Sequence, residues 1–364
     1  MNKPRDITRT LIPTMPSANE VLPYLREIDD SRWYSNFGPL NSQLVSRLAN
    51  YFQVDENQLC LIGNATLGLQ AIAELIDVDP KSNFDLPSFT FAASPSSLIS
   101  AKRRLRFLDI DNDMRCVPAY NSKVIMDVLP FGESIRVENW MNNLDFLIID
   151  AAASFDALKS FGKNTKLVCP YALVVSLHST KLLGAGEGGV VISSKPELIK
   201  QIKLWQNFGF DLDNSSARIT MLNGTNAKMS EYSCAVALAS FDKWDYVRSS
   251  YLQIQSFAYE LSNRCGIQMH SAMRFGRVNP YWILIPEDIE NRIAIERECR
   301  KMNFETRLWW QYGCHRMPGF TKIETVDLTN TEWISERYIG LPFHLHLPTD
   351  YWESISLLLE NLST

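Results

Sequence analysis

The chain has 364 residues, of which 46% are hydrophobic and 21% are charged, and its formal net charge at pH 7 is −5. This composition excludes a disordered tail, a collagen and a coiled coil, and the acidic balance disfavours a nucleic-acid partner, which needs a basic face. It allows an anionic small substrate, because a few local cations and helix ends suffice to bind one. No apolar run reaches 18 residues and the N-terminus has no apolar signal core, so we expect a cytoplasmic protein with no membrane partner.

In chain order, a helix is predicted over 17–30, followed from Gln58 to Ser194 by short apolar runs that alternate with turns and helical patterns. Several runs are almost continuously apolar, which is typical of strands covered on both faces of a sheet. Alternation of strands with helices predicts an α/β domain with a mainly parallel sheet. The strand candidates cover 58–63, 83–87, 104–110, 123–131, 144–150, 171–179 and 188–194, and helices are expected over 65–76 and from 96.

A different pattern follows from Met229. Residues 229–265 predict one very long helix or two consecutive ones, and 281–286 predicts a strand. Further helices are expected over 289–302 and 351–362. We therefore expect two domains: residues 1–240 as the N-terminal segment and large domain, and residues 241–364 as a smaller α+β domain.

The cysteines and histidines give no sign of a metal centre. The seven cysteines are an odd number without a CxxC pair, so neither a disulfide framework nor a zinc ribbon is indicated. Reduced cysteines that serve as small core residues are the better interpretation. We predict no metal site.

The strongest chemical signal is SLHSTKLLGAGEGGVVISS, residues 176–194. A strand ends in a polar turn that contains Lys181, and a glycine-rich stretch leads into the next strand. An isolated lysine at such a junction is usually just solvated, but the glycines let the backbone approach a bulky flat group. A lysine enclosed there suits Schiff-base chemistry.

Three further features accompany this lysine. Asp150 ends an apolar strand and is either a helix N-cap or a buried carboxylate that needs a cation. A strand feeds a helix that starts near Ala65 and Thr66, and such a helix end can hold a phosphate. In PSFTFAAS, Phe89 and Phe91 alternate with smaller residues. Such aromatic residues are mostly core residues, but one of the two could stack on a cofactor ring. Together with Lys181, these features match what pyridoxal phosphate requires.

With these features in this order, the chain resembles the DegT/DnrJ/EryC1/StrS family of nucleotide-sugar aminotransferases, which are fold-type-I pyridoxal-phosphate enzymes. The resemblance runs from WYSNFGPL at Trp33 to LPFHLHLPTDYWESI near the end, and its most specific match is SLHSTKLLGAGEGG. It implies a mainly parallel seven-stranded sheet flanked by helices, with a smaller α+β C-terminal domain.

The resemblance also implies roles for single residues. Lys181 would bind the cofactor covalently and act as the catalytic acid and base, and Asp150 would pair with the pyridinium nitrogen. Phe91 would stack on the ring. The phosphate would be held by Ala65, Thr66 and Ser176.

Two further segments resemble family motifs. NGTNAKMSEYSCAVAL places Asn226 where the family reaches the phosphate of the neighbouring subunit, which implies a homodimer with shared active sites; a helix N-cap is the alternative. RLWWQYGCHRMPGF resembles a segment that lines the substrate cleft. The substrate-binding candidates are His178, Arg307, Trp309 and His315.

Some positions depart from the family pattern. Ala153 stands where a glutamine commonly supports the phenolic oxygen of the cofactor ring. Asn64 and Ala65 replace the usual Ser and Gly of the phosphate turn, and Lys228 replaces the usual Arg. These changes affect fine geometry rather than the lysine chemistry.

The resulting prediction is an aminotransferase that moves an amino group from L-glutamate to a nucleotide-linked keto-deoxysugar. Our first choice of substrate is dTDP-4-keto-6-deoxy-D-glucose, aminated at C4 for surface polysaccharide such as O-antigen. The alternatives are C3 amination of a dTDP-3-keto-6-deoxyhexose and a non-catalytic regulator that binds the cofactor or a nucleotide sugar. A sugar dehydratase is disfavoured, because that branch of the family replaces the lysine that is Lys181 here.

Overall fold

A computed structural model describes residues 7–210, 219–273 and 276–362. Its large sheet has eight strands in the order β1-β7-β6-β5-β4-β2-β3-β10. Strand β7 runs antiparallel to β1 and β6, and the other neighbouring strands are parallel. The strands are β1 (Leu59–Ile62), β2 (Asn83–Pro87), β3 (Arg104–Leu108), β4 (Val124–Val128), β5 (Phe146–Asp150), β6 (Tyr171–Ser176), β7 (Gly189–Ser193) and β10 (Glu324–Thr325).

The predicted sheet is confirmed in class but not in strand number. Seven strands were expected and the sheet has eight, because β10 pairs in parallel with the edge strand β3. Both residues of β10 are exposed, so no apolar run in the sequence indicates a strand there. Since β10 comes from the stretch expected to form the small domain, the chain returns to the large sheet after residue 241.

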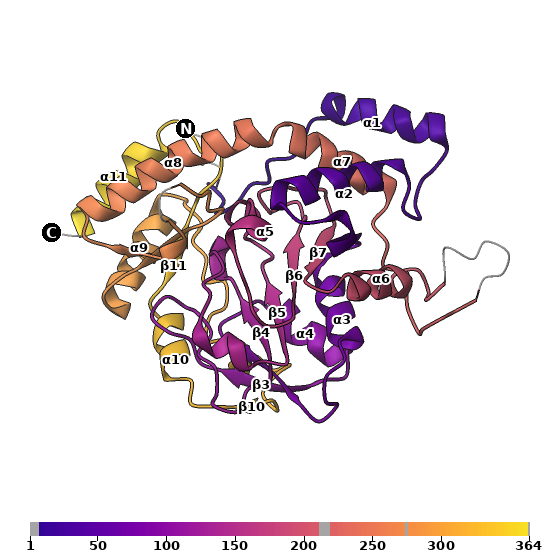
Figure 1. Ribbon diagram of the computed structural model, residues 1–364. Coiled ribbons are helices and arrows are strands. Elements are labelled where there is room, and N and C mark those ends of the chain that lie inside the picture. Colours follow the sequence, from indigo (N-terminus) through magenta and orange to yellow (C-terminus); the bar gives the residue numbers. More distant parts are fainter. Residues whose placement is uncertain (1–6, 211–218, 274–275, 363–364) are drawn as a thin grey trace.

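Helices cover both faces of this sheet (Figure 1). Consecutive strand residues point to opposite faces, and in β5 Leu147 and Ile149 join one apolar core while Phe146 and Ile148 join the other. The first core includes α1 (Ala18–Ser31), α2 (Pro39–Phe52) and α7 (Glu231–Asp242), and the second includes α3 (Ala65–Leu75), α4 (Ala93–Ser100) and α6 (Pro196–Trp205). A short helix, α5 (Phe161–Asn164), lies between β5 and β6 along the chain.

The C-terminal part has its own small antiparallel sheet in the order β11-β9-β8. Its strands are β8 (Gln268–Met269), β9 (Trp282–Ile285) and β11 (Ile339–Leu341), and its helices are α8 (Trp244–Arg264), α9 (Ile289–Lys301), α10 (Thr329–Ser335) and α11 (Tyr351–Leu362). The predicted helical stretch 229–265 is two helices, α7 and α8, which meet at Lys243. Among the described residues, no helix is long and apolar enough to cross a bilayer.

The parallel strands place their carboxyl ends at one edge of the large sheet. Asp150 ends β5 and Ser176 ends the neighbouring strand β6, so two predicted site residues lie at this edge. Ligands of open α/β sheets bind outside the carboxyl ends of the strands.

Candidate active site

A cavity of about 700 Å³ opens at the carboxyl ends of β5 and β6. Its volume is in the range of ordinary small-molecule sites. Segments far apart in the chain meet there, from Leu11 to Trp310. The lining includes nine of the eleven predicted site residues: Ala65, Thr66, Phe91, Asp150, Ser176, His178, Lys181, Arg307 and Trp309.

Asp150 lines this cavity and is 7% exposed. Burial raises the pKa of its carboxyl group, while hydrogen bonds and the charge of Lys181 act in the opposite direction. Ser94 Oγ donates to one carboxylate oxygen (2.7 Å) and the backbone N–H of Ala152 donates to the other (3.2 Å). No described helix starts directly after Asp150, since the next helical residues begin at Asp156, so the helix-cap alternative is wrong for this residue. A buried carboxylate of this kind is stabilised by a cationic ligand group.

The N-terminus of α3 forms one wall. Asn64 caps this helix by accepting a hydrogen bond from the N–H of Leu67 (2.9 Å), and the first turn carries no acidic residue. The neighbouring N–H groups of Ala65 and Thr66 belong to the first helical turn, where backbone donors lack partners within the helix. Such an end favours a phosphate group.

Ser176 lines the cavity together with this helix end, and the strand beside Ser176 packs closely against the backbone at the start of α3. Its partner across the sheet is Gly189 in β7, and a Cβ at Gly189 would lie 2.9 Å from the backbone nitrogen of Ala65. Glycine at this position therefore lets the strand reach the turn that precedes α3. The Ser176 hydroxyl accepts a hydrogen bond from the N–H of His178 (3.2 Å).

Lys181 is half-buried in the loop between β6 and β7. Its Nζ lies 3.2 Å from the hydroxyl oxygen of Tyr281. The loop is fixed by a backbone hydrogen bond from the N–H of Ser179 to the carbonyl of Gly186 (3.0 Å), and Gly186 has a φ of +82°. That left-handed conformation is the one that favours glycine.

Phe91 lines the same cavity and is 60% exposed. A large aromatic side chain this exposed is not a core residue, so the core alternative is wrong. Its ring is open to stacking with a flat ligand.

The rim combines charge with an aromatic surface. The guanidinium of Arg307 lies 5.7 Å from the ring centre of Trp309 and 3.1 Å from a carboxylate oxygen of Glu305. Trp309 packs over Gly340 of β11, where a Cβ would come within 2.0 Å of the indole ring. His178 Nδ1 lies 2.8 Å from the hydroxyl of Thr180.

Two predicted site residues lie outside the cavity lining. His315 Nδ1 lies 2.7 Å from Ser88 Oγ and its Nε2 lies 3.4 Å from Glu332, so both ring nitrogens are engaged away from the cavity. Asn226 is exposed, and its side-chain oxygen accepts a hydrogen bond from Lys228 Nζ (2.7 Å). The alternative role of Asn226 as a helix cap is wrong, because α7 is capped by Ser230.

Sequence reasoning missed two residues that contribute to the site. Ser94 holds the carboxylate of Asp150, and Tyr281 contacts Lys181. Ser94 lies four residues after Thr90, whose hydroxyl lies 2.8 Å from it. The serine-rich stretch 87–100 was the available signal for Ser94, whereas Tyr281 had no signal except its place at the start of a predicted strand.

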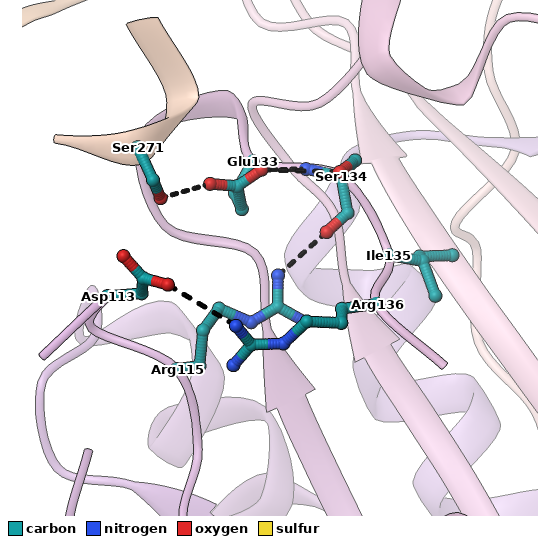
Figure 2. Close-up of a pocket in the computed structure, with 7 residues that line it drawn as sticks. All are labelled: Asp113, Arg115, Glu133, Ser134, Ile135, Arg136 and Ser271. Atoms are coloured by element: carbon teal, nitrogen blue, oxygen red, sulfur yellow. Dashed lines mark hydrogen bonds and ion pairs between the residues drawn. The ribbon is translucent and has the colours of Figure 1, made fainter. Parts of the chain in front are cut away.

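A smaller cavity of about 220 Å³ lies among charged side chains (Figure 2). Arg136 pairs there with Asp113 (3.3 Å), and Arg115 donates to the backbone carbonyl of Ser134 (2.7 Å). Glu133 accepts a hydrogen bond from Ser271, which precedes β9. These charged and polar side chains pair with one another and link segments that are far apart in the sequence. We therefore assign the arrangement a structural role rather than a catalytic one.

Comparison with known proteins identifies the fold and its chemistry. The model of the DegT/DnrJ/EryC1/StrS aminotransferase family matches residues 17–359. The chain belongs to this family. It is accordingly a sugar aminotransferase that uses pyridoxal phosphate, with the fold-type-I architecture that its sheet displays.

Individual relatives of this aminotransferase match over nearly its full length. A dTDP-4-amino-4,6-dideoxy-D-glucose transaminase from Shigella dysenteriae is 25% identical, and the match covers 98% of each protein. A Bacillus cereus protein assigned as a PLP-dependent aminotransferase has a crystal structure with a TM-score of 0.85 and 27% identity, covering 97% of this chain and 100% of that one. DesI, solved with its TDP-sugar product, gives a TM-score of 0.81 at 26% identity, covering 99% and 95%.

The cavity of this aminotransferase fits pyridoxal phosphate. A buried carboxylate, the free end of α3 and a lysine line one cavity, and they match the ring nitrogen, the phosphate and the aldehyde of the cofactor. When bound, the cofactor supplies a cationic ring that withdraws electrons from the substrate carbon attached to nitrogen.

Proposed function

We propose that this aminotransferase transfers the amino group of L-glutamate to C4 of dTDP-4-keto-6-deoxy-D-glucose, giving dTDP-4-amino-4,6-dideoxy-D-glucose. The Shigella relative bears the name of this reaction and matches from end to end. The likeness to DesI, solved with a TDP-sugar, supports the same nucleotide class. The observation that carries the proposal is that Lys181, Asp150 and the N-terminus of α3 line one cavity.

In this proposal each residue has a defined task. Asp150 keeps the ring nitrogen of the cofactor protonated, because its buried carboxylate is stabilised by that positive charge. The N–H groups of Ala65 and Thr66, together with the Ser176 hydroxyl, hold the phosphate. Phe91 stacks on one face of the ring.

Lys181 does the proton chemistry. Its Nζ would hold the bound cofactor and, once the amino donor has replaced it there, would act as the base that takes the proton from the donor carbon. In the second half of the reaction the same Nζ would return a proton to the sugar carbon that receives the amino group. A side chain that both anchors and moves a proton must lie at the cavity wall, as Lys181 does.

The rim residues are assigned to the substrates. Arg307 is half-exposed and carries the positive charge that a diphosphate or a glutamate carboxylate needs. Trp309 offers a flat surface beside it for a base or a sugar ring. We assign His178 to the same pocket, since it also lines the cavity. His315 is left a supporting role through its contact with Ser88.

We also propose that the enzyme is a homodimer in which Asn226 reaches the phosphate bound by the neighbouring copy. Trp33, Tyr34 and Tyr232 are each about half exposed, and the rings of Tyr34 and Tyr232 stack with centroids 6.3 Å apart. An aromatic cluster of this kind on a surface favours contact with another protein surface. A second copy of the chain would cover it.

The product of this reaction is an activated amino-sugar donor. A glycosyl transfer into a polysaccharide is the class of step that would consume it, and we propose surface polysaccharide, O-antigen included, as its destination. The proposal places the enzyme in the cytoplasm, where nucleotide sugars serve as donors.

Two alternatives remain specific enough to test. Amination at C3 of a 3-keto sugar would use the same residues. The nucleotide of that substrate could also be UDP, because a relative from Campylobacter jejuni, 25% identical over 211 residues, is named a UDP-4-amino-4,6-dideoxy-N-acetyl-β-L-altrosamine transaminase. A non-catalytic regulator would bind the cofactor without turnover.

The experiment is incubation of the cofactor-loaded enzyme with L-glutamate and a panel of dTDP- and UDP-linked 3-keto and 4-keto deoxysugars. Mass spectrometry and NMR of the products identify the aminated carbon. We expect a 4-amino product from dTDP-4-keto-6-deoxy-D-glucose and none from Lys181→Ala. Cofactor binding without any amino-sugar product would favour the regulator.

A further inference from the structure

The site lacks one contact that the family pattern supplies. By the resemblance described above, Ala153 stands where the family commonly has a glutamine against the phenolic 3-oxygen of the cofactor ring. Ala153 lines the cavity, but a methyl group can neither donate nor accept a hydrogen bond. An anionic oxygen left without a donor in a partly enclosed site is costly.

A different side chain brings a donor to the same cavity. Tyr281 is 7% exposed, and its ring makes edge contacts with Phe131 (5.9 Å between centroids) and Trp309 (5.1 Å). Its hydroxyl lies 3.2 Å from Lys181 Nζ. The phenol is thus held in the wall with its polar end beside the lysine.

The backbone around Tyr281 is held by hydrogen bonds to two side chains. The N–H of Val278 donates to a carboxylate oxygen of Asp156 (2.7 Å), and the N–H of Tyr281 donates to the side chain of Asn279 (2.9 Å). Asp156 is also paired with Arg248 (2.8 Å). This anchoring fixes where the hydroxyl points.

The edges of the cofactor ring decide what the hydroxyl would meet. In pyridoxal phosphate the ring nitrogen and the aldehyde carbon lie at opposite ends, and the phosphate arm and the 3-oxygen lie on opposite edges. Asp150, Lys181 and Thr66 all line the cavity, and the proposed function assigns Asp150 and Lys181 to the two ends of the ring and Thr66 to its phosphate edge. The edge opposite Thr66 is left for the 3-oxygen.

Ala153 and Tyr281 belong to the same wall. A Cβ at Gly132 would lie 3.0 Å from Pro280 and 3.3 Å from the carbonyl oxygen of Ala153, so the segment before Tyr281 packs beside Ala153. We propose that the hydroxyl of Tyr281 donates a hydrogen bond to the 3-oxygen of the bound cofactor and so replaces the missing glutamine. This inference rests on the proposed function of the cavity.

The consequence is spectroscopic. A hydrogen bond from Tyr281 stabilises the anionic 3-oxygen. The nitrogen attached to the cofactor, which shares its proton with that oxygen, therefore binds the proton less tightly. Removing the hydroxyl should therefore raise the pH midpoint at which the visible absorption band of the bound cofactor changes. For Tyr281→Phe we expect a rise of about one pH unit, which is a tenfold change in proton affinity.

The experiment titrates the cofactor-loaded wild type, Tyr281→Phe and the double variant Tyr281→Phe/Ala153→Gln from pH 5 to 10. Thermal unfolding of each variant verifies that the fold is intact. We expect the double variant to return towards the wild-type midpoint, because glutamine restores a donor at the same edge.

The outcomes separate the two claims. A raised midpoint in Tyr281→Phe that falls again in the double variant supports the inference. An unchanged midpoint in Tyr281→Phe, or a raised one that the glutamine does not lower, overturns it while the proposed function stands. A wild-type protein that binds no cofactor overturns the proposed function itself.

Discussion

Asp150 carries a charge that the cofactor-free protein holds at a cost. Burial raises its pKa above the usual value for an aspartate, so its ionisation destabilises the folded state as the pH rises through that raised pKa. Asparagine retains an acceptor for the N–H of Ala152 and offers a donor to Ser94 Oγ, which is free to donate to Thr90 instead. Asp150→Asn therefore suits the empty site better than the native residue does.

We expect cofactor-free Asp150→Asn to unfold at the same or a higher temperature than the wild type at pH 7. Its aminotransferase activity should fall about a hundredfold or more, because the neutral amide does not keep the ring nitrogen charged. Calorimetry and steady-state kinetics test the two parts. Near-normal turnover by this variant would remove the role assigned to Asp150.

His270 makes stability depend on pH. It is buried beside Glu133, and desolvation lowers its pKa to about 4. The unfolded chain takes up a proton near pH 6.5 that the folded chain takes up only near pH 4, so stability falls as the pH drops between these values. The loss contributed by this one residue is at most about 3 kcal/mol.

His270→Asn keeps an acceptor for the backbone N–H of Ala272, which donates to Nδ1 in the native protein (3.1 Å). We expect its unfolding free energy to decline less between pH 6.5 and 4 than that of the wild type. Urea unfolding at several pH values measures this. Parallel pH profiles for the two proteins would contradict the account.

Among the helices, α2 depends on a residue far along the chain. Its N-cap is Gly38, which has no side chain to accept a hydrogen bond. The carboxylate of Glu231 in α7 instead accepts from the N–H groups of Leu40 (2.7 Å) and Asn41 (3.1 Å). This contact also offsets the positive end of the helix dipole.

Glu231→Ala should lower the unfolding free energy by about 2 kcal/mol, as expected for loss of a buried cap. The matched control is Glu290→Ala, because Glu290 is an exposed residue in the first turn of α9 and that helix is capped by Asp288. Chemical unfolding of both variants provides the comparison. Equal stabilities of the two would show that Glu231 does not cap α2.

The same element shows where sequence patterns stop being informative. The strands of the large sheet could be predicted, because burial on both faces demands continuous apolar runs such as Phe146–Asp150. Helix α2 was not predicted, since its cap lies 191 residues from Leu40. Strand β10 was missed because its two residues are exposed and pair only at a sheet edge.

Some residues of the candidate site could likewise be predicted from the sequence and others could not. Asp150 could be predicted from the sequence, because it ends an apolar run that forms β5. Ser176 followed only from the family resemblance, since it lies inside the predicted strand 171–179 and ends β6 in the structure. Tyr281 could not be predicted as a site residue, because its position depends on how the segment before β9 is anchored to Asp156 through Val278. His315 lies in the segment RLWWQYGCHRMPGF, which resembles a family motif, but its ring contacts Ser88 and does not line the cavity.

At the scale of the whole molecule, the shared-site proposal links cofactor binding to assembly. If Asn226 reaches the phosphate in the partner's site, cofactor should tighten the dimer and dilution should release cofactor. Asn226→Ala should weaken cofactor binding about tenfold, a loss near 1.4 kcal/mol. Sedimentation and fluorescence titration at several protein concentrations measure both effects.

The control for this prediction is Asn263→Ala, an exposed position on α8. This variant should match the wild type in both measurements. A stable monomer with full cofactor occupancy and activity would defeat the shared-site proposal.

The central claim is that Lys181 anchors pyridoxal phosphate in the cavity at the carboxyl ends of β5 and β6. The most direct test is borohydride reduction of the cofactor-loaded native protein, followed by proteolysis and mass spectrometry of the labelled peptide. We predict that the reduced cofactor is attached to the peptide containing Lys181 and that Lys181→Ala yields no labelled peptide. Stable label on any other lysine of the native protein would contradict the account.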